Sequence, residues 1–100
     1  MFLFDFIIPS SHPCLPGHFP DNSIVPGVVI IDKIITGFTS DRANVNVKNI
    51  PNVKFLQPLE PEVLVQVRIE EKKVNLFTFD CFVKGTVIVS GQLRTQQVET

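Results

Sequence analysis

The sequence has only two cysteines and no paired cysteine motif. Cys14 and Cys81 lie far apart, so we expect both to be free, buried thiols in a reducing compartment. The residue types of His12, Cys14, His18 and Asp32 would suit a metal ion, but their spacing matches no zinc pattern, and no metal site is predicted. Nothing places Cys14 within hydrogen-bonding reach of His18, which disfavours a cysteine nucleophile. His12 is interpreted as structural.

The chain also lacks an excess of charge and any long hydrophobic run. Its formal net charge is -1 and its nine basic residues are scattered, which argues against nucleic-acid binding. Nothing approaches the roughly 20 apolar residues needed to cross a bilayer, so no membrane span is predicted. The apolar start of the chain has no basic first region and is interrupted by Asp5. We therefore predict no signal peptide and a cytoplasmic protein.

No internal repeat, low-complexity tract or linker divides the sequence. Its 100 residues, 44% of them hydrophobic, predict one domain over residues 1–100. This length is near the lower limit at which a single hydrophobic core suffices, so self-association would help stability.

The stretch from His12 to Asp32 is the most informative part of the sequence. It begins as a loop rich in proline and glycine, which restricts the backbone and can hold His18 in one place. Over residues 26–39 apolar residues cover nearly every face of a predicted helix, and Pro26 suits its first position. Such a helix is normally wrapped by other structure. We therefore expect Asp32 to be buried, which favours the protonated carboxyl as a proton donor.

The same residues also fit two short strands, residues 23–25 and 28–31, joined by a Pro-Gly turn. β-Branched residues favour strands, and periodicity does not separate a short buried strand from a buried helix. The residues alone leave both interpretations open.

Alternating apolar residues predict strands before and after this segment. The expected strands cover residues 2–8, 43–55, 63–69, 77–83 and 87–93. Pro51 indicates a bend or an edge position, and turns are expected at Lys72-Lys73 and at Gly85. Ile88 is assigned to the sheet face opposite the core. The resulting fold class is α+β, with one helix and a curved antiparallel sheet.

A motif within this stretch resembles a known family. His12-Pro13-x-Leu15-Pro16-Gly17-His18-Phe19-Pro20, followed by Ile24-Val25-Pro26-Gly27-Val28, is similar to the signature of hotdog-fold β-hydroxyacyl-(acyl carrier protein) dehydratases. The similarity is closest to the small branch associated with aryl polyene and related pigment synthesis. Asp32 falls fourteen positions after His18, where that family has its catalytic glutamate or aspartate. The resemblance covers about residues 12–35 and favours the helix over the two strands.

The resemblance implies a hotdog fold whose central helix is the segment at residues 26–39. It also implies a homodimer, or a higher homo-oligomer, in which two sheets join. Each active site would then combine His18 of one subunit with Asp32 of the other.

The implied reaction, in fatty acid or polyene-type synthesis, removes water from a 3-hydroxyacyl thioester on an acyl carrier protein and gives a trans-2-enoyl thioester. His18 would take a proton from the carbon beside the carbonyl, and Asp32 would assist departure of the hydroxyl. By the family pattern, the backbone N–H groups of Gly27 and Val28 would stabilise the thioester oxygen. Phe19 and Pro26 would contact the substrate. The resemblance implies no metal and no organic cofactor.

Two other functions remain open at this stage. A hotdog thioesterase would hydrolyse the same class of thioester, and a non-catalytic acyl-binding or assembly subunit would keep the fold without the chemistry. The departures from the motif at Asp21 and Ser23 bear on the choice, because Asp21 adds a negative charge close to His18.

Overall fold

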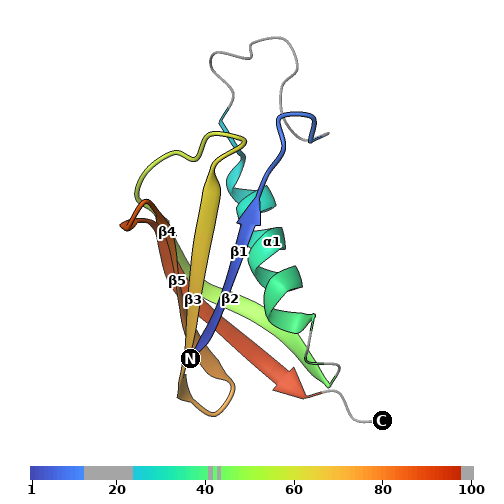
Figure 1. Ribbon diagram of the computed structural model, residues 1–100. Coiled ribbons are helices and arrows are strands. Elements are labelled where there is room, and N and C mark those ends of the chain that lie inside the picture. Colours follow the sequence, from blue (N-terminus) through green and yellow to red (C-terminus); the bar gives the residue numbers. More distant parts are fainter. Residues whose placement is uncertain (13–23, 41, 43, 98–100) are drawn as a thin grey trace.

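The computed structural model describes residues 1–12, 24–40, 42 and 44–97, which form one antiparallel sheet and one helix (Figure 1). In chain order the elements are β1 (Phe2–Ile7), α1 (Gly27–Thr39), β2 (Val45–Phe55), β3 (Leu64–Lys73), β4 (Leu76–Val83) and β5 (Thr86–Gln97). The sheet has five strands in the order β1-β3-β4-β5-β2, and every neighbouring pair is antiparallel. Helix α1 lies against one face. The predicted fold class is confirmed.

Helix α1 buries one stripe and leaves another exposed. The buried residues of the helix are Val29, Ile30, Ile34 and Phe38. The exposed residues recur at intervals of four and are Val28, Asp32, Thr36 and Ser40. This is the spacing of one helix face. The prediction that Asp32 is buried is therefore wrong for the single chain, because the sheet covers only one side of the helix.

The start of the helix differs from the expectation by one residue. Pro26 has an extended backbone, with φ of -60° and ψ of 144°, and is the N-cap residue, so the first helical residue is Gly27. The two competing strands at this position are excluded.

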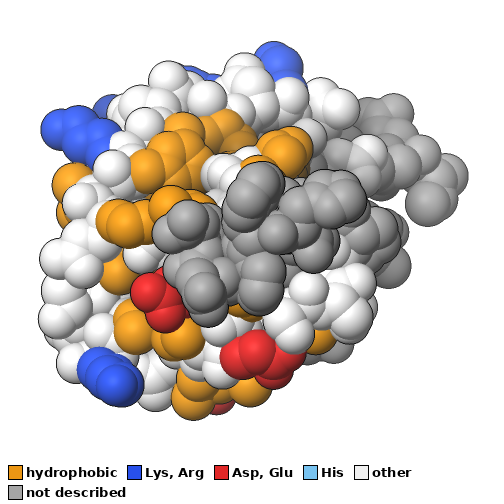
Figure 2. Space-filling model, turned by 90° about the horizontal axis from the view of Figure 1, so that it is seen from above, with side chains coloured by type: hydrophobic (Ala, Val, Ile, Leu, Met, Phe, Trp, Pro, Cys, Tyr) orange, Lys and Arg blue, Asp and Glu red, His pale blue; other side chains and the backbone are white. Residues whose placement is uncertain are grey.

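Figure 2 looks onto the end of the molecule at which α1 begins, and hydrophobic side chains remain on that surface beside acidic ones.

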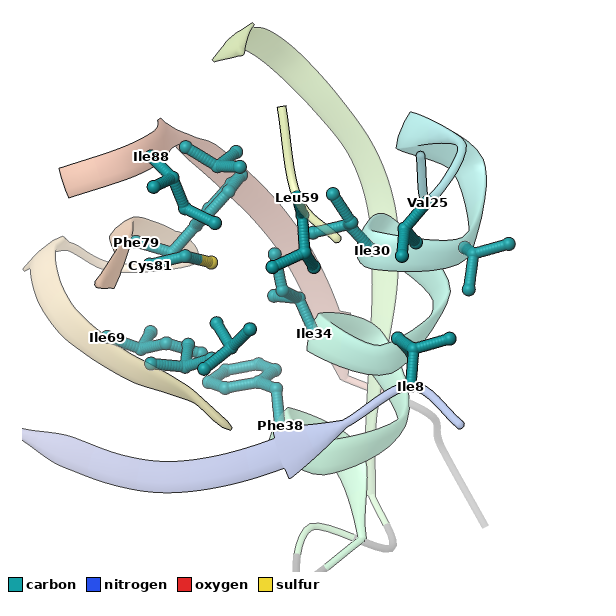
Figure 3. Close-up of a cluster of buried hydrophobic side chains, with 14 of the residues drawn as sticks. Ile8, Val25, Ile30, Ile34, Phe38, Leu59, Ile69, Phe79, Cys81 and Ile88 are labelled. Carbon is teal, nitrogen blue, oxygen red and sulfur yellow. The ribbon is translucent and has the colours of Figure 1, made fainter. Parts of the chain in front are cut away.

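The core fills the space between α1 and the sheet (Figure 3). Ile30, Ile34 and Phe38 point from the helix toward the strands, where Phe79 and Cys81 lie fully buried. Near the C-terminus of α1, the rings of Phe38 and Phe77 pack edge to face, with their centroids 4.9 Å apart. The Arg42 guanidinium lies over the Phe38 ring at 4.6 Å and donates a hydrogen bond to the Phe38 carbonyl at 3.1 Å.

The predicted strands are present, with bounds that differ by a few residues, and one predicted turn is wrong. Pro51 lies inside β2, which is an edge strand, so the predicted edge position is confirmed. The register of β2 against β5 shifts on either side of Asn49. The turn between β3 and β4 is at Val74 and Asn75, not at Lys72-Lys73. Asn75 has a φ of 63°, which asparagine tolerates better than most residues. The turn at Gly85 is confirmed by its φ of 80°.

Ile88 was assigned to the wrong face. Cys81 pairs with Val89 and Phe82 pairs with Val87, so Ile88 is the extra residue of a β-bulge. The bulge breaks the alternation, and Ile88 and Val89 are both buried.

Replacing Ile34 with alanine tests the packing of α1. The Ile34 side chain is 0% exposed, and removing it leaves a cavity, so we expect the free energy of unfolding to fall by about 2–5 kcal/mol. Thr36→Ala, at an exposed position of the same helix, is the control and should change it by less than about 0.5 kcal/mol. Urea unfolding measures both, and equal effects of the two substitutions would contradict the packing described here.

Candidate active site

The N-terminus of α1 presents backbone donors without partners inside the helix. The amides of Val29 and Ile30 donate to the Pro26 carbonyl at 3.0 and 3.4 Å, so the helical bonding starts there. The amides of Gly27 and Val28 have no acceptor within the helix, and Pro26 has no side-chain acceptor to cap them. The helix dipole adds partial positive charge at this end, and the first turn holds no acidic side chain to offset it. This arrangement can stabilise a developing oxyanion.

The ring of Phe55, at the end of β2, lies directly against Gly27. A Cβ atom on residue 27 would be 2.7 Å from Phe55 Cζ, so the close approach depends on glycine. The chain entering the helix is fixed to the connection between β2 and β3, because the Val25 amide donates to the Leu59 carbonyl at 2.8 Å.

An open pocket of about 320 Å³ lies beside this contact, and we call it the Phe55 pocket. Ile24, Phe55 and Leu56 line it and keep about half of their surface exposed, at 52%, 49% and 55%. Sequence analysis missed these residues as site residues. The alternation over residues 53–55 signalled the strand, but not that its end meets the helix start.

A second open pocket of about 210 Å³ lies along the exposed face of the helix, and we call it the Asp32 pocket. Its lining residues are His12, Val28, Val29 and Asp32. Val28 and Asp32 share the same helix face because they are four residues apart, and Val28 is 73% exposed. His12, interpreted as structural from the sequence, is thus placed with the predicted catalytic carboxyl.

The structure brings together part of the predicted site. Pro26, Gly27, Val28 and Asp32 occupy the N-cap and the first two turns of α1. His18 and Phe19 lie outside the described residues, so the pairing of His18 with Asp32 stays a prediction. Cys14 lies outside them as well. Among the residues that are described, no group of three or more His, Cys, Asp or Glu side chains could hold a metal ion.

In the described part of the chain, α1 included, no helix has the length and apolarity needed to cross a membrane.

Comparison with known proteins extends the family resemblance well beyond the motif. The family model described as ApeI-like, ApeI dehydratase, matches residues 1–92. The chain belongs to the ApeI-like dehydratase family. A curated relative, the 3-hydroxyacyl-[acyl-carrier-protein] dehydratase FabZ of Aromatoleum aromaticum, is 30% identical over 99 residues, which cover 86% of this chain. The chain spans 66% of the length of that relative.

Solved structures confirm the hotdog fold of this ApeI-like chain. The dehydratase heterocomplex ApeI:P from Xenorhabdus doucetiae superposes with a TM-score of 0.78 at 24% identity, covering 93% of this chain and 84% of that one. A point mutant of the fluoroacetyl-CoA-specific thioesterase FlK superposes with a TM-score of 0.72 at 13% identity, covering 98% and 88%. The fold is therefore common to dehydratases and thioesterases and does not choose between them.

Cys81 is a core residue of this ApeI-like chain and not a nucleophile. It is fully buried on β4 and forms no disulfide. Burial, and to a smaller extent the neighbouring Asp80 carboxylate, raise the pKa of its thiol from 9.0 to about 12. The thiolate, which is the reactive form, is therefore scarce at neutral pH.

Alkylation of the Cys14→Ser variant tests this assignment, because Cys81 is then the one thiol left. At pH 8 we expect the folded protein to react at least about tenfold more slowly than the urea-unfolded chain. Because the thiol pKa is higher in the folded protein, the unfolded chain loses the Cys81 proton at a lower pH than the folded protein does. The contribution of Cys81 to the free energy of unfolding should therefore be intact below pH 9 and be lost as the pH rises toward 12. Equal rates in the folded and unfolded protein would contradict a buried thiol.

Proposed function

We propose that this chain removes water from a 3-hydroxyacyl thioester carried by an acyl carrier protein and releases a trans-2-enoyl thioester. Family membership over residues 1–92 supports the reaction class, and the name of the Aromatoleum aromaticum relative supports the substrate class. The observation that carries the proposal is the arrangement of backbone donors at the start of α1. Two backbone donors that the helix does not use stand there, one helical turn before an exposed carboxyl.

In the proposed chemistry, two side chains each transfer a proton, and two backbone amides stabilise the negative charge that develops on the substrate. His18 takes the proton from the carbon beside the carbonyl, and the electrons of that bond form the new double bond. Negative charge on the thioester oxygen is stabilised by the amides of Gly27 and Val28. Asp32 gives a proton to the hydroxyl, which leaves as water when its bond to carbon breaks. The proton held by His18 then returns to Asp32 through solvent.

The proposed assembly is a homodimer in which each site uses His18 of one subunit and Asp32 of the other. Two features of the single chain support it. Asp32 and Val28 are exposed on α1. Strand β2 is eleven residues long and, within the described residues, forms hydrogen bonds on one side only. Such an edge is available for pairing with a second copy.

The Phe55 pocket is the proposed site for the first part of the acyl chain. Its apolar side chains lie next to Gly27, so a thioester held by the helix amides would direct its chain toward them. Phe19 and Pro26 are the further proposed substrate contacts. The proposed compartment is the cytoplasm, which is consistent with the free thiol of Cys81.

Product analysis with wild type, His18→Ala and Asp32→Asn tests the function. We expect wild type to convert a 3-hydroxyacyl carrier protein to the enoyl product and each variant to lose about 10²–10⁴-fold in rate, as for removal of a general acid or base. Thr36→Asn, one helical turn beyond Asp32, is the matched control and should keep the wild-type rate.

The same assay separates the alternatives. Release of free thiol without an enoyl product would identify a thioesterase. A rate that is near zero in wild type and unchanged in both variants would identify a non-catalytic acyl-binding subunit.

A further inference from the structure

A further open pocket lies at the turn between β4 and β5, and we call it the turn pocket. It holds about 300 Å³. Its apolar side chains include Val63, Val83 and Ile88, and Lys84 and Thr86 contribute polar ones. A cavity of roughly 150 Å³ lined by apolar side chains is large enough to bind benzene, so the turn pocket has room for a ring or a short alkyl segment.

The connection between β2 and β3 separates the turn pocket from the Phe55 pocket. Gln57, Pro58 and Leu59 line both pockets. The first two are exposed, whereas Leu59 is only 3% exposed, so Leu59 is the residue of this segment that belongs to the interior. In Figure 3 Leu59 lies between Ile30, which lines the Phe55 pocket, and Ile88, which lines the turn pocket. The Leu59 side chain therefore forms a wall between the two pockets.

Backbone hydrogen bonds hold this wall in place from both sides. The Leu59 carbonyl accepts the amide of Val25, directly before the helix, at 2.8 Å. The Ile88 carbonyl accepts the amides of Leu56 and Gln57 at 2.7 and 3.3 Å, which ties the start of the connection to β5. A proline directly precedes Leu59 and another follows it by two residues, and both restrict the backbone. The wall can move aside only if these hydrogen bonds break.

We propose that Leu59 is a specificity-determining residue, which sets the length of acyl chain that the Phe55 pocket accepts. A thioester held by the amides of Gly27 and Val28 directs its chain past Phe55 toward Leu59. Chain atoms gain apolar contacts up to the wall, and atoms beyond it would have to displace a buried side chain. The chain therefore selects short acyl groups. The inference rests on the proposed function, because the Phe55 pocket is the proposed acyl site.

Binding of S-(2-oxoalkyl) pantetheine thioethers of increasing chain length tests this role without turnover. These probes keep a carbonyl group for the helix amides, but they can neither lose water nor be hydrolysed. In wild type we expect the affinity to rise about fourfold with each added methylene, the value of one buried CH₂ group, and to stop rising where the chain reaches Leu59. In Leu59→Ala the rise should continue for about two further methylenes, because the shortened side chain joins the two pockets. Calorimetric titration measures both series.

Three further variants separate a change of the wall from a loss of stability. Ile34→Ala removes a buried side chain that lines neither pocket, and it should keep the wild-type limit. Thr86→Trp fills the turn pocket from an exposed position, and in the Leu59→Ala background it should restore the wild-type limit. If Leu59→Ala does not fold, Leu59→Val makes the smaller change and should extend the rise by about one methylene.

Several binding results would overturn the proposal. One is a limit at the same chain length in wild type and in the Leu59 variants, and another is a wild-type affinity that rises throughout the series. An extended rise that Thr86→Trp does not remove would show that the chain takes another path. A wild type that binds none of the probes would remove the proposed acyl site and this inference together.

The failure of the dehydration gives a different pattern. A limit that moves in Leu59→Ala, in a protein that forms no enoyl product, would keep the role of Leu59 and remove the dehydration. A protein that forms the enoyl product and has an unmoved limit would do the reverse.

Discussion

The packing of α1 against the sheet determines the chemistry available to this chain. The buried stripe of the helix, centred on Ile34, fixes the rotation of the helix about its axis. That rotation places Asp32 on the open side and directs the start of the helix at Phe55. Because Pro26 has no capping side chain, the first amides of the helix receive no side-chain cap from the N-cap residue. Within the described residues, the packing of α1 therefore leaves the Asp32 carboxyl exposed.

The candidate site is assembled from segments that are distant in the sequence. The turn after β1 brings His12, the helix brings Asp32, and the end of β2 brings Phe55. Backbone hydrogen bonds from Val25 to Leu59 and from Glu62 to Ile8 link these segments to one another. The site is thus held by connections at one end of the sheet, while the buried core supplies the rigid base on which they rest.

Much of the fold followed from local sequence patterns. Alternation placed the strands correctly, since side chains on a strand alternate between a buried and an exposed face. It failed at Ile88, where a bulge adds a residue, and a bulge leaves no trace in a period-two pattern. Asp32 was expected to be buried because apolar neighbours surround it in sequence, but one sheet covers only one side of a helix. The Phe55 pocket and the Asp32 pocket are each lined by residues that are distant in the sequence, Phe55 with Ile24 and His12 with Asp32, and no local pattern contains such proximity.

The central claim is that two subunits complete one site, with His18 from one and Asp32 from the other. Mixing the variants His18→Ala and Asp32→Asn tests it directly, after subunit exchange has been demonstrated with a mass tag. Each variant alone should be inactive. In an equal mixture half of the dimers are hybrids with one intact site of two, so about a quarter of the wild-type dehydratase activity should return. A mixture that exchanges subunits and stays as inactive as either variant would contradict the account.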